Sequence, residues 1–310
     1  MDDTGIIERS LRESVYCETG DYPNMWISTA DCATTLIKKL FEKYVEDDET
    51  LIITSEFEHE NVREIVSSYR NVFKLNVEDI DECKLNRLIS HLKTNKPKKV
   101  FVYLIGTRVT SGIVTPQFIF ESIKKILEKY NIQKTMVIDA CQEIYPIRDY
   151  SLFDHIIFTA HSALMYFDLG ILYSKNNPKF ECDWMSFFNY VAMKKGLIDN
   201  NSEVLLFNSR MRNIFSESLI EFGNAEIYNS APWFFSFNVE HTKLRFTKSI
   251  YDSLRNVGVR LVGTESIDEQ LKKYGEAYYQ VKMRAQHYVI HPEQLSKAIE
   301  MIKCLLVYSK

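Results

Sequence analysis

Polar side chains that can bind ligands and exchange protons follow two short apolar stretches in the middle of the chain. Residues 135–142 read Thr-Met-Val-Ile-Asp-Ala-Cys-Gln, and residues 153–162 read Phe-Asp-His-Ile-Ile-Phe-Thr-Ala-His-Ser. Both have the pattern of buried strands, and ligands bind at the carboxyl edge of a parallel sheet. We therefore expect a ligand site at this edge. The polar residues concerned are Asp139, Gln142, Thr159, His161 and Ser162.

Alternating strand and helix patterns position these residues. They run from about residue 30 to about residue 175, which is typical of a doubly wound parallel sheet. Apolar residues from Phe118 to Leu127 mark one face of a helix that Pro116 begins and Asn131 ends. The strand candidates are Leu51–Ser55, Val100–Ile105, Met136–Ile138 and Ile156–Phe158.

The pattern changes after Pro232, where shorter strands at 233–239, 258–262 and 278–285 accompany helical stretches at 244–256 and 295–306. This texture predicts a small α+β domain beside the large α/β domain. We therefore predict a large domain over residues 20–230, a small domain over 231–310 and a separate N-terminal segment, 1–19, that could pack on the small domain.

Six motifs resemble, in order along the chain, those of the aminotransferase class V and cysteine desulfurase family of pyridoxal phosphate (PLP) enzymes. The resemblance covers most of the chain at low similarity. It implies an α/β fold of the fold type I PLP-transferase kind, in a homodimer that builds each cleft at the subunit interface. The motifs are Glu58-His59, Thr110-Ser-Gly112-Ile-Val, Asp139-Ala-Cys-Gln142, Thr159-Ala-His161, Gly170-Ile-Leu-Tyr173, and Lys282-Met-Arg284-Ala followed by His291-Pro-Glu-Gln-Leu.

The resemblance also implies roles around the cofactor. Asp139 would keep the pyridine nitrogen protonated, His59 would lie over the ring, and Gln142 would bond the ring hydroxyl. Thr159 and His161 would hold the phosphate. Read without the resemblance, Asp139 is a turn cap at a strand end and His59 is an ordinary helix-start residue.

Arg284 is the candidate for binding a ligand carboxylate, as the resemblance implies. Its guanidinium would form two parallel hydrogen bonds with the carboxylate of an amino or keto acid. The alternative for Arg284 is a salt bridge to a local acid such as Glu276.

Ser162 is the main departure from the family pattern, because these enzymes have a lysine there. The lysine amine forms the internal imine with the cofactor and moves the proton at the substrate's alpha carbon, and a serine can do neither. Val109 stands where the family has an asparagine near the ring. Asp31 places a carboxylate where a helix start would bind phosphate, unless it turns away to cap the helix. We therefore do not expect conventional transamination or desulfuration.

Three functions remain open. The protein could be an atypical enzyme that holds PLP or pyridoxamine phosphate (PMP) noncovalently, with His161 and Ser162 as the catalytic candidates. It could instead use the old cleft without any cofactor, for catalysis or for binding an amino acid or another carboxylate. It could finally be a catalytically silent partner of another enzyme. The first explains Asp139, His59 and Gln142, whereas the second better explains Asp31, Val109 and Ser162.

Composition excludes several other classes. The 310 residues are 45% hydrophobic and 26% charged with a net charge of -4, which gives no electrostatic case for nucleic acid or an anionic membrane. No basic segment followed by an apolar one opens the chain and no apolar run approaches a membrane span, so we expect a cytoplasmic protein. The six cysteines are dispersed, and His287 and His291 have no third ligand nearby, so we expect no metal site.

Overall fold

The computed structural model describes residues 25–45, 49–82, 84–109, 112–143, 148–159 and 169–180, together with the backbone of four short strands between residues 225 and 282. Three predicted site residues, His161, Ser162 and Arg284, lie outside the described residues, as do the N-terminal segment 1–19 and the predicted domain boundary at residue 230. The homodimer also stays a prediction.

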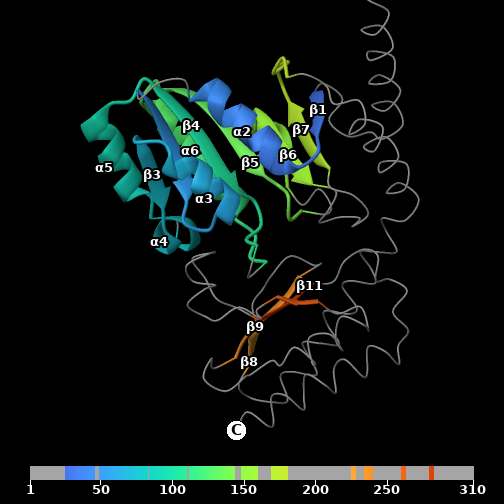
Figure 1. Cartoon of the computed structure of the whole chain (residues 1–310). Coiled ribbons are helices and arrows are strands. Elements are labelled where there is room, and N and C mark those ends of the chain that lie inside the picture. The colour runs from blue at the N-terminus through green and yellow to red at the C-terminus, as the bar shows by residue number, and fades with distance from the viewer. Residues whose placement is uncertain are drawn as a thin grey trace, which may run out of the picture.

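Seven strands form one large sheet in the order β1-β7-β6-β5-β4-β2-β3 (Figure 1). The run from β3 to β6 is parallel, whereas β7 is antiparallel to both β6 and β1. The mainly parallel sheet that the sequence predicts is therefore confirmed. The strands are β1 (Trp26–Ala30), β2 (Thr50–Ser55), β3 (Val72–Leu75), β4 (Lys99–Ile105), β5 (Gln133–Asp139), β6 (His155–Thr159) and β7 (Gly170–Ser174).

Helices cover both faces of the sheet, because each has an apolar stripe with the spacing of a helical face. On one face, α2 (Ala33–Tyr44) and α3 (Glu60–Ser67) pack their buried residues against the sheet. On the other face lie α4 (Val77–Asp81), α5 (Asn86–Asn95) and α6 (Gln117–Lys129), and a 3-10 turn covers Tyr150–Leu152. None of the described helices is long and apolar enough to cross a membrane.

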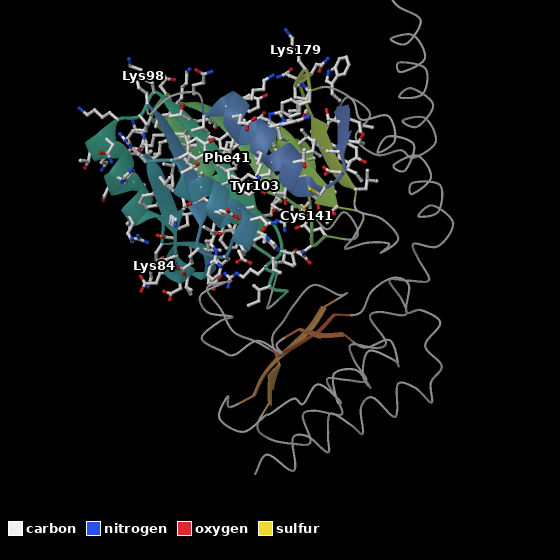
Figure 2. All side chains as sticks on the ribbon, in the orientation of Figure 1. Phe41, Lys84, Lys98, Tyr103, Cys141 and Lys179 are labelled. Carbon is white, nitrogen blue, oxygen red and sulfur yellow. The ribbon has the colours of Figure 1, made fainter. Side chains whose placement is uncertain are left out.

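Aromatic side chains fill the space between α2 and the sheet. Phe41 of α2 lies against Tyr103 of β4 with ring centroids 5.4 Å apart (Figure 2). On the other face of the sheet, the predicted helix at Pro116 is confirmed. Pro116 is the N-cap of α6, and Asn131 follows its end in the left-handed conformation with φ 58°.

A second sheet of four antiparallel strands has the order β10-β11-β9-β8. Its strands confirm the three that the sequence predicts after Pro232 and add one before it. They are β8 (Ala225–Ile227), β9 (Phe234–Val239), β10 (Arg260–Val262) and β11 (Tyr279–Lys282).

Candidate active site

The carboxyl ends of four parallel strands meet at one edge of the large sheet. β2 ends at Ser55, β4 at Ile105, β5 at Asp139 and β6 at Thr159. Ile105 is the register partner of Asp139, which itself pairs with Ile157 of β6. Asp139 and Thr159 therefore end neighbouring strands at this edge of the sheet.

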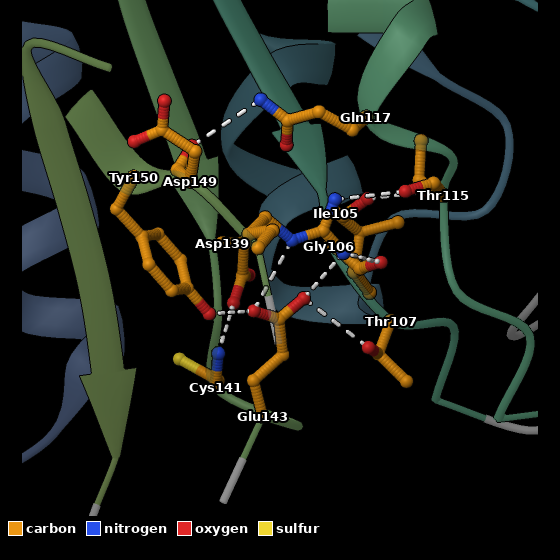
Figure 3. Close-up of polar contacts among 11 residues, drawn as sticks. Ile105, Gly106, Thr107, Thr115, Gln117, Asp139, Cys141, Glu143, Asp149 and Tyr150 are labelled. Carbon is orange, nitrogen blue, oxygen red and sulfur yellow. Dashed lines mark hydrogen bonds and ion pairs between the residues drawn. The ribbon is translucent and has the colours of Figure 1, made fainter. Parts of the chain in front are cut away.

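Asp139 is held by two donors from inside the protein. The Tyr103 hydroxyl donates to Oδ2 at 2.8 Å. The backbone N–H of Cys141 donates to Oδ1 at 2.9 Å (Figure 3). Burial and then the negative charge of Asp139 raise the pKa of Tyr103 well above its usual value, so the phenol keeps its proton and remains a donor. Each carboxylate oxygen has a second lone pair, so Asp139 can also accept from a ligand N–H.

Glu58 is a second carboxyl beneath the same edge. The Ser55 hydroxyl donates to Oε1 at 2.6 Å and the Ile105 N–H at 3.1 Å. Burial, with a smaller contribution from the charge of Asp139, raises the pKa of Glu58 to about 8. Glu58 is therefore mostly protonated at neutral pH.

His59 is the N-cap of α3. Its Nδ1 accepts a hydrogen bond from the Asn61 N–H at 3.2 Å, and the ring is half-buried. His59 is therefore a helix-start residue, as the sequence indicates when it is read without the family resemblance. Its predicted role over a cofactor ring stays a prediction, as does the role of Gln142, which is half-buried in the turn after Asp139.

The start of α2 meets the end of β6 and the beginning of β7. Gly170 is the register partner of both Thr159 and Ala30. A Cβ atom at Gly170 would lie 2.4 Å from the carbonyl carbon and oxygen of Cys32, so only glycine permits this approach of strand to helix. The structure therefore brings Thr159 and the start of α2 together, as a shared phosphate site would require.

Hydrogen-bond donors where α2 begins and β6 ends already donate to groups of the protein itself. Asp31 Oδ1 accepts from the Cys32 N–H at 2.8 Å and from the Thr35 hydroxyl at 2.7 Å, and the Thr35 bond lowers the pKa of Asp31. Cys32 occupies the N-cap position without a side-chain capping bond, and Asp31 accepts from the backbone N–H of this N-cap residue. The Thr159 hydroxyl donates to the Leu169 carbonyl at 3.2 Å.

A buried ion pair that the sequence analysis missed fixes the loops around the site. Glu143 accepts from Arg148 Nη2 at 2.7 Å, from the Thr107 hydroxyl at 3.2 Å and from the Tyr150 hydroxyl (Figure 3). The loops after β4 and β5 are thereby held together. Arg148 also donates to the carbonyls of Gly106 and Thr115, both at 2.8 Å.

Metal ligation has no support in the part of the chain that the structure describes. No group of three or more His, Cys, Asp or Glu side chains is placed there to hold an ion. Among these residues, Cys32 and Cys141 are half-buried cysteines that form no disulfide bond.

No family model and no curated protein matches this chain. Solved structures do match across nearly all of it. A NifS-like protein from Rickettsia africae has a TM-score of 0.72 at 15% identity, covering 98% of this chain and 90% of that one. A cysteine desulfurase from Escherichia coli has a TM-score of 0.71 at 13% identity, and the match covers 96% of this chain and 83% of that one. This chain has the fold type I fold of PLP enzymes. A serine palmitoyltransferase from S. paucimobilis, solved with a bound PLP-myriocin aldimine, shares the fold. Its TM-score is 0.66 at 12% identity, and the match covers 97% of this chain and 77% of that one.

Within that fold, the described residues fit one end of a PLP molecule and not the other. Asp139, an acid at a strand end, suits the pyridine nitrogen. At the phosphate end, Asp31 accepts from the Cys32 N–H and the Thr35 hydroxyl, and its carboxylate has the same sign of charge as a phosphate. Among the described residues, the phosphate end of the site therefore does not fit the cofactor.

Proposed function

We propose that this protein binds an amino acid or a related small carboxylate at the carboxyl edge of the sheet and acts there without lysine-bound PLP. The observation that carries the proposal is Asp31, whose ionised carboxylate takes the Cys32 N–H and the Thr35 hydroxyl at the start of α2. The serine at position 162 supports it from the sequence, because no amine stands there to form an imine.

Charge favours a ligand that carries an ammonium group. Asp139 presents lone pairs of a buried carboxylate, and Asp31 adds a second negative charge near the end of β6 and the beginning of β7. An amino acid would place its ammonium group near these acids, and Arg284 is the predicted partner of its carboxylate. Hydrogen bonds to charged groups contribute about 1.5–3 kcal/mol each, so loss of one partner weakens binding roughly tenfold to 100-fold.

A second candidate function is favoured by Asp139 alone. A noncovalently held PLP or PMP would use this acid at its ring nitrogen, and the chain would then be an atypical enzyme of the same fold. This candidate requires the phosphate to be accepted despite Asp31.

Calorimetric titration with the standard amino acids, their 2-oxo acids, PLP and PMP tests the proposal. We expect an amino or oxo acid to bind and PLP to bind more weakly. Asp139→Asn should weaken the amino acid at least tenfold. Asp31→Asn should strengthen PLP about threefold to tenfold, because it removes repulsion at an exposed helix start. Glu64→Gln, which removes an exposed charge on α3, is the matched control and should change neither.

The opposite pattern would overturn the proposal. If the unmodified protein retains PLP through gel filtration, binds it more tightly than every amino acid tested, and is indifferent to Asp31→Asn, the protein holds the cofactor and the second candidate is correct.

A further inference from the structure

Glu58 is a buried titratable group to which the proposed function gives no role. Its side chain is about 1% exposed, and it lies between the ends of β2 and β4. One oxygen, Oε1, accepts both of the hydrogen bonds that hold the residue in place, from Ser55 and from the Ile105 N–H. These bonds fix the direction of the carboxyl group.

The other oxygen, Oε2, is fully buried and has no hydrogen-bond partner among the described residues. A purely structural role explains Oε1, which satisfies a backbone N–H at a strand end where β2 and β4 separate. It does not explain Oε2, because a buried polar atom without a partner is costly and rare. A protonated Oε2 in particular needs an acceptor.

The surrounding groups favour a proton on Glu58. Asp139 on β5 faces it as an anion, and Tyr103 on β4 faces it as a neutral phenol. The cation Arg108 is engaged elsewhere: its guanidinium stacks 3.5 Å from the ring centroid of Phe57 and pairs with Asp81. Burial is the main reason why the pKa of Glu58 is raised, and the charge of Asp139 adds to it.

We propose that Glu58 enters the site as a protonated carboxylic acid whose Oε2–H donates to a carbonyl or carboxylate oxygen of the bound ligand. Where the ligand carries an ammonium group, Asp139 binds that group while Glu58 binds an oxygen. The inference rests on the proposed function, because it assumes a ligand at this edge of the sheet. It narrows that function to ligands that present a carbonyl or carboxylate oxygen as a hydrogen-bond acceptor, with or without an ammonium group.

Infrared spectroscopy of the full-length protein tests the protonation state without any ligand. The difference spectrum between the unmodified protein and Glu58→Gln at pH 7 should contain the C=O band of one protonated carboxyl group. The pKa of Glu58, raised to about 8 by burial, predicts that the band disappears as the pH passes through this value. No such band should appear for the control, Glu64→Gln. Absence of the Glu58 band at pH 7 overturns the proposal.

Pyruvate, the simplest 2-oxo acid, tests contact with the ligand because it offers both kinds of acceptor oxygen. It should shift the Glu58 band and bind at least tenfold more weakly above pH 9 than at pH 7. Glu58→Gln keeps an N–H donor at the same place, so it should bind pyruvate within about threefold of the unmodified protein and without the pH dependence. Glu58→Leu removes the donor and should lose binding tenfold or more.

Failure of this inference can be separated from failure of the proposed function. If amino or oxo acids bind but neither pyruvate nor any bound acid moves the Glu58 band, the inference alone is wrong and Glu58 is structural. If the band is present and no member of the ligand set binds, the proposed function is wrong and the donor role falls with it. Because Glu58→Leu could fail to fold, near-ultraviolet circular dichroism is recorded for it, and Glu58→Gln decides the case if the leucine variant is unfolded.

Discussion

Removing the Tyr103 hydroxyl should destabilise the folded protein, because buried Asp139 loses a hydrogen-bond donor. The hydroxyl donates to Oδ2 at 2.8 Å, and both residues are buried, so water cannot replace it. A hydrogen bond to a charged group contributes about 1.5–3 kcal/mol, and we expect Tyr103→Phe to lower the free energy of unfolding by roughly 2 kcal/mol at pH 7. Phenylalanine keeps the ring that packs on Phe41, so little of this loss comes from packing.

A double-mutant cycle measured by urea unfolding isolates the contact. Tyr103→Phe should cost less than about 1 kcal/mol in the Asp139→Asn background, which gives a coupling energy of at least about 1 kcal/mol. Tyr44→Phe, a half-buried tyrosine of α2 that stacks on Phe101, is the control and should change stability by no more than about 0.5 kcal/mol. Equal costs of Tyr103→Phe in the two backgrounds would show that the hydroxyl does not support Asp139.

Three further predictions concern other parts of the molecule. Gly170→Ala should cost about 3 kcal/mol in urea unfolding, because its Cβ would lie 2.4 Å from backbone atoms of Cys32; a loss under about 1 kcal/mol would refute the close approach. Burial lowers the pKa of His155 to about 4 from an unfolded value near 6.5. The neutral buried imidazole therefore contributes fully to stability above pH 6.5, and as the pH falls toward 4 the free energy of unfolding should drop by about 3 kcal/mol. His155→Gln should remove this part of the acid sensitivity, and an unchanged dependence of stability on pH would contradict the prediction. Arg284→Lys should weaken amino-acid or keto-acid binding while leaving the melting temperature nearly unchanged, whereas a large loss of stability with unchanged affinity would mean a structural role.

The sheet was predictable where each strand has its own apolar pattern. β4 contains the apolar run Val100–Ile105 and β5 the shorter apolar run Met136–Ile138, and their parallel pairing follows from the helix between them. β1 gives a weaker signal, because Trp26–Ala30 mixes polar and apolar residues and its partner, β7, begins 140 residues later at Gly170. The antiparallel edge of the sheet therefore depends on long-range packing that no local pattern reveals.

The site was predictable at its strand ends and not in its supporting contacts. Asp139 stood out because an acid directly follows an apolar run. Tyr103 did not, since a tyrosine within an apolar strand suggests packing, and its contact with Asp139 depends on the register of β4 against β5. Glu143 and Arg148 pair across a loop without a sequence motif. Glu58 was part of a recognised pair, but its burial, which gives it a raised pKa, is a property of the folded chain.

Absorbance spectroscopy of Ser162→Lys with added PLP tests most directly whether the chain has abandoned lysine-bound cofactor chemistry. The substitution places an amine where the resemblance to class V aminotransferases leads us to expect a lysine, and leaves Asp31 at the start of α2 with its bonds to the Cys32 N–H and the Thr35 hydroxyl. We predict no visible imine band and no borohydride-reducible adduct at position 162, because the phosphate end of the site still rejects the cofactor. A stable imine band in the single variant, at PLP concentrations near that of the protein, would contradict the proposed function.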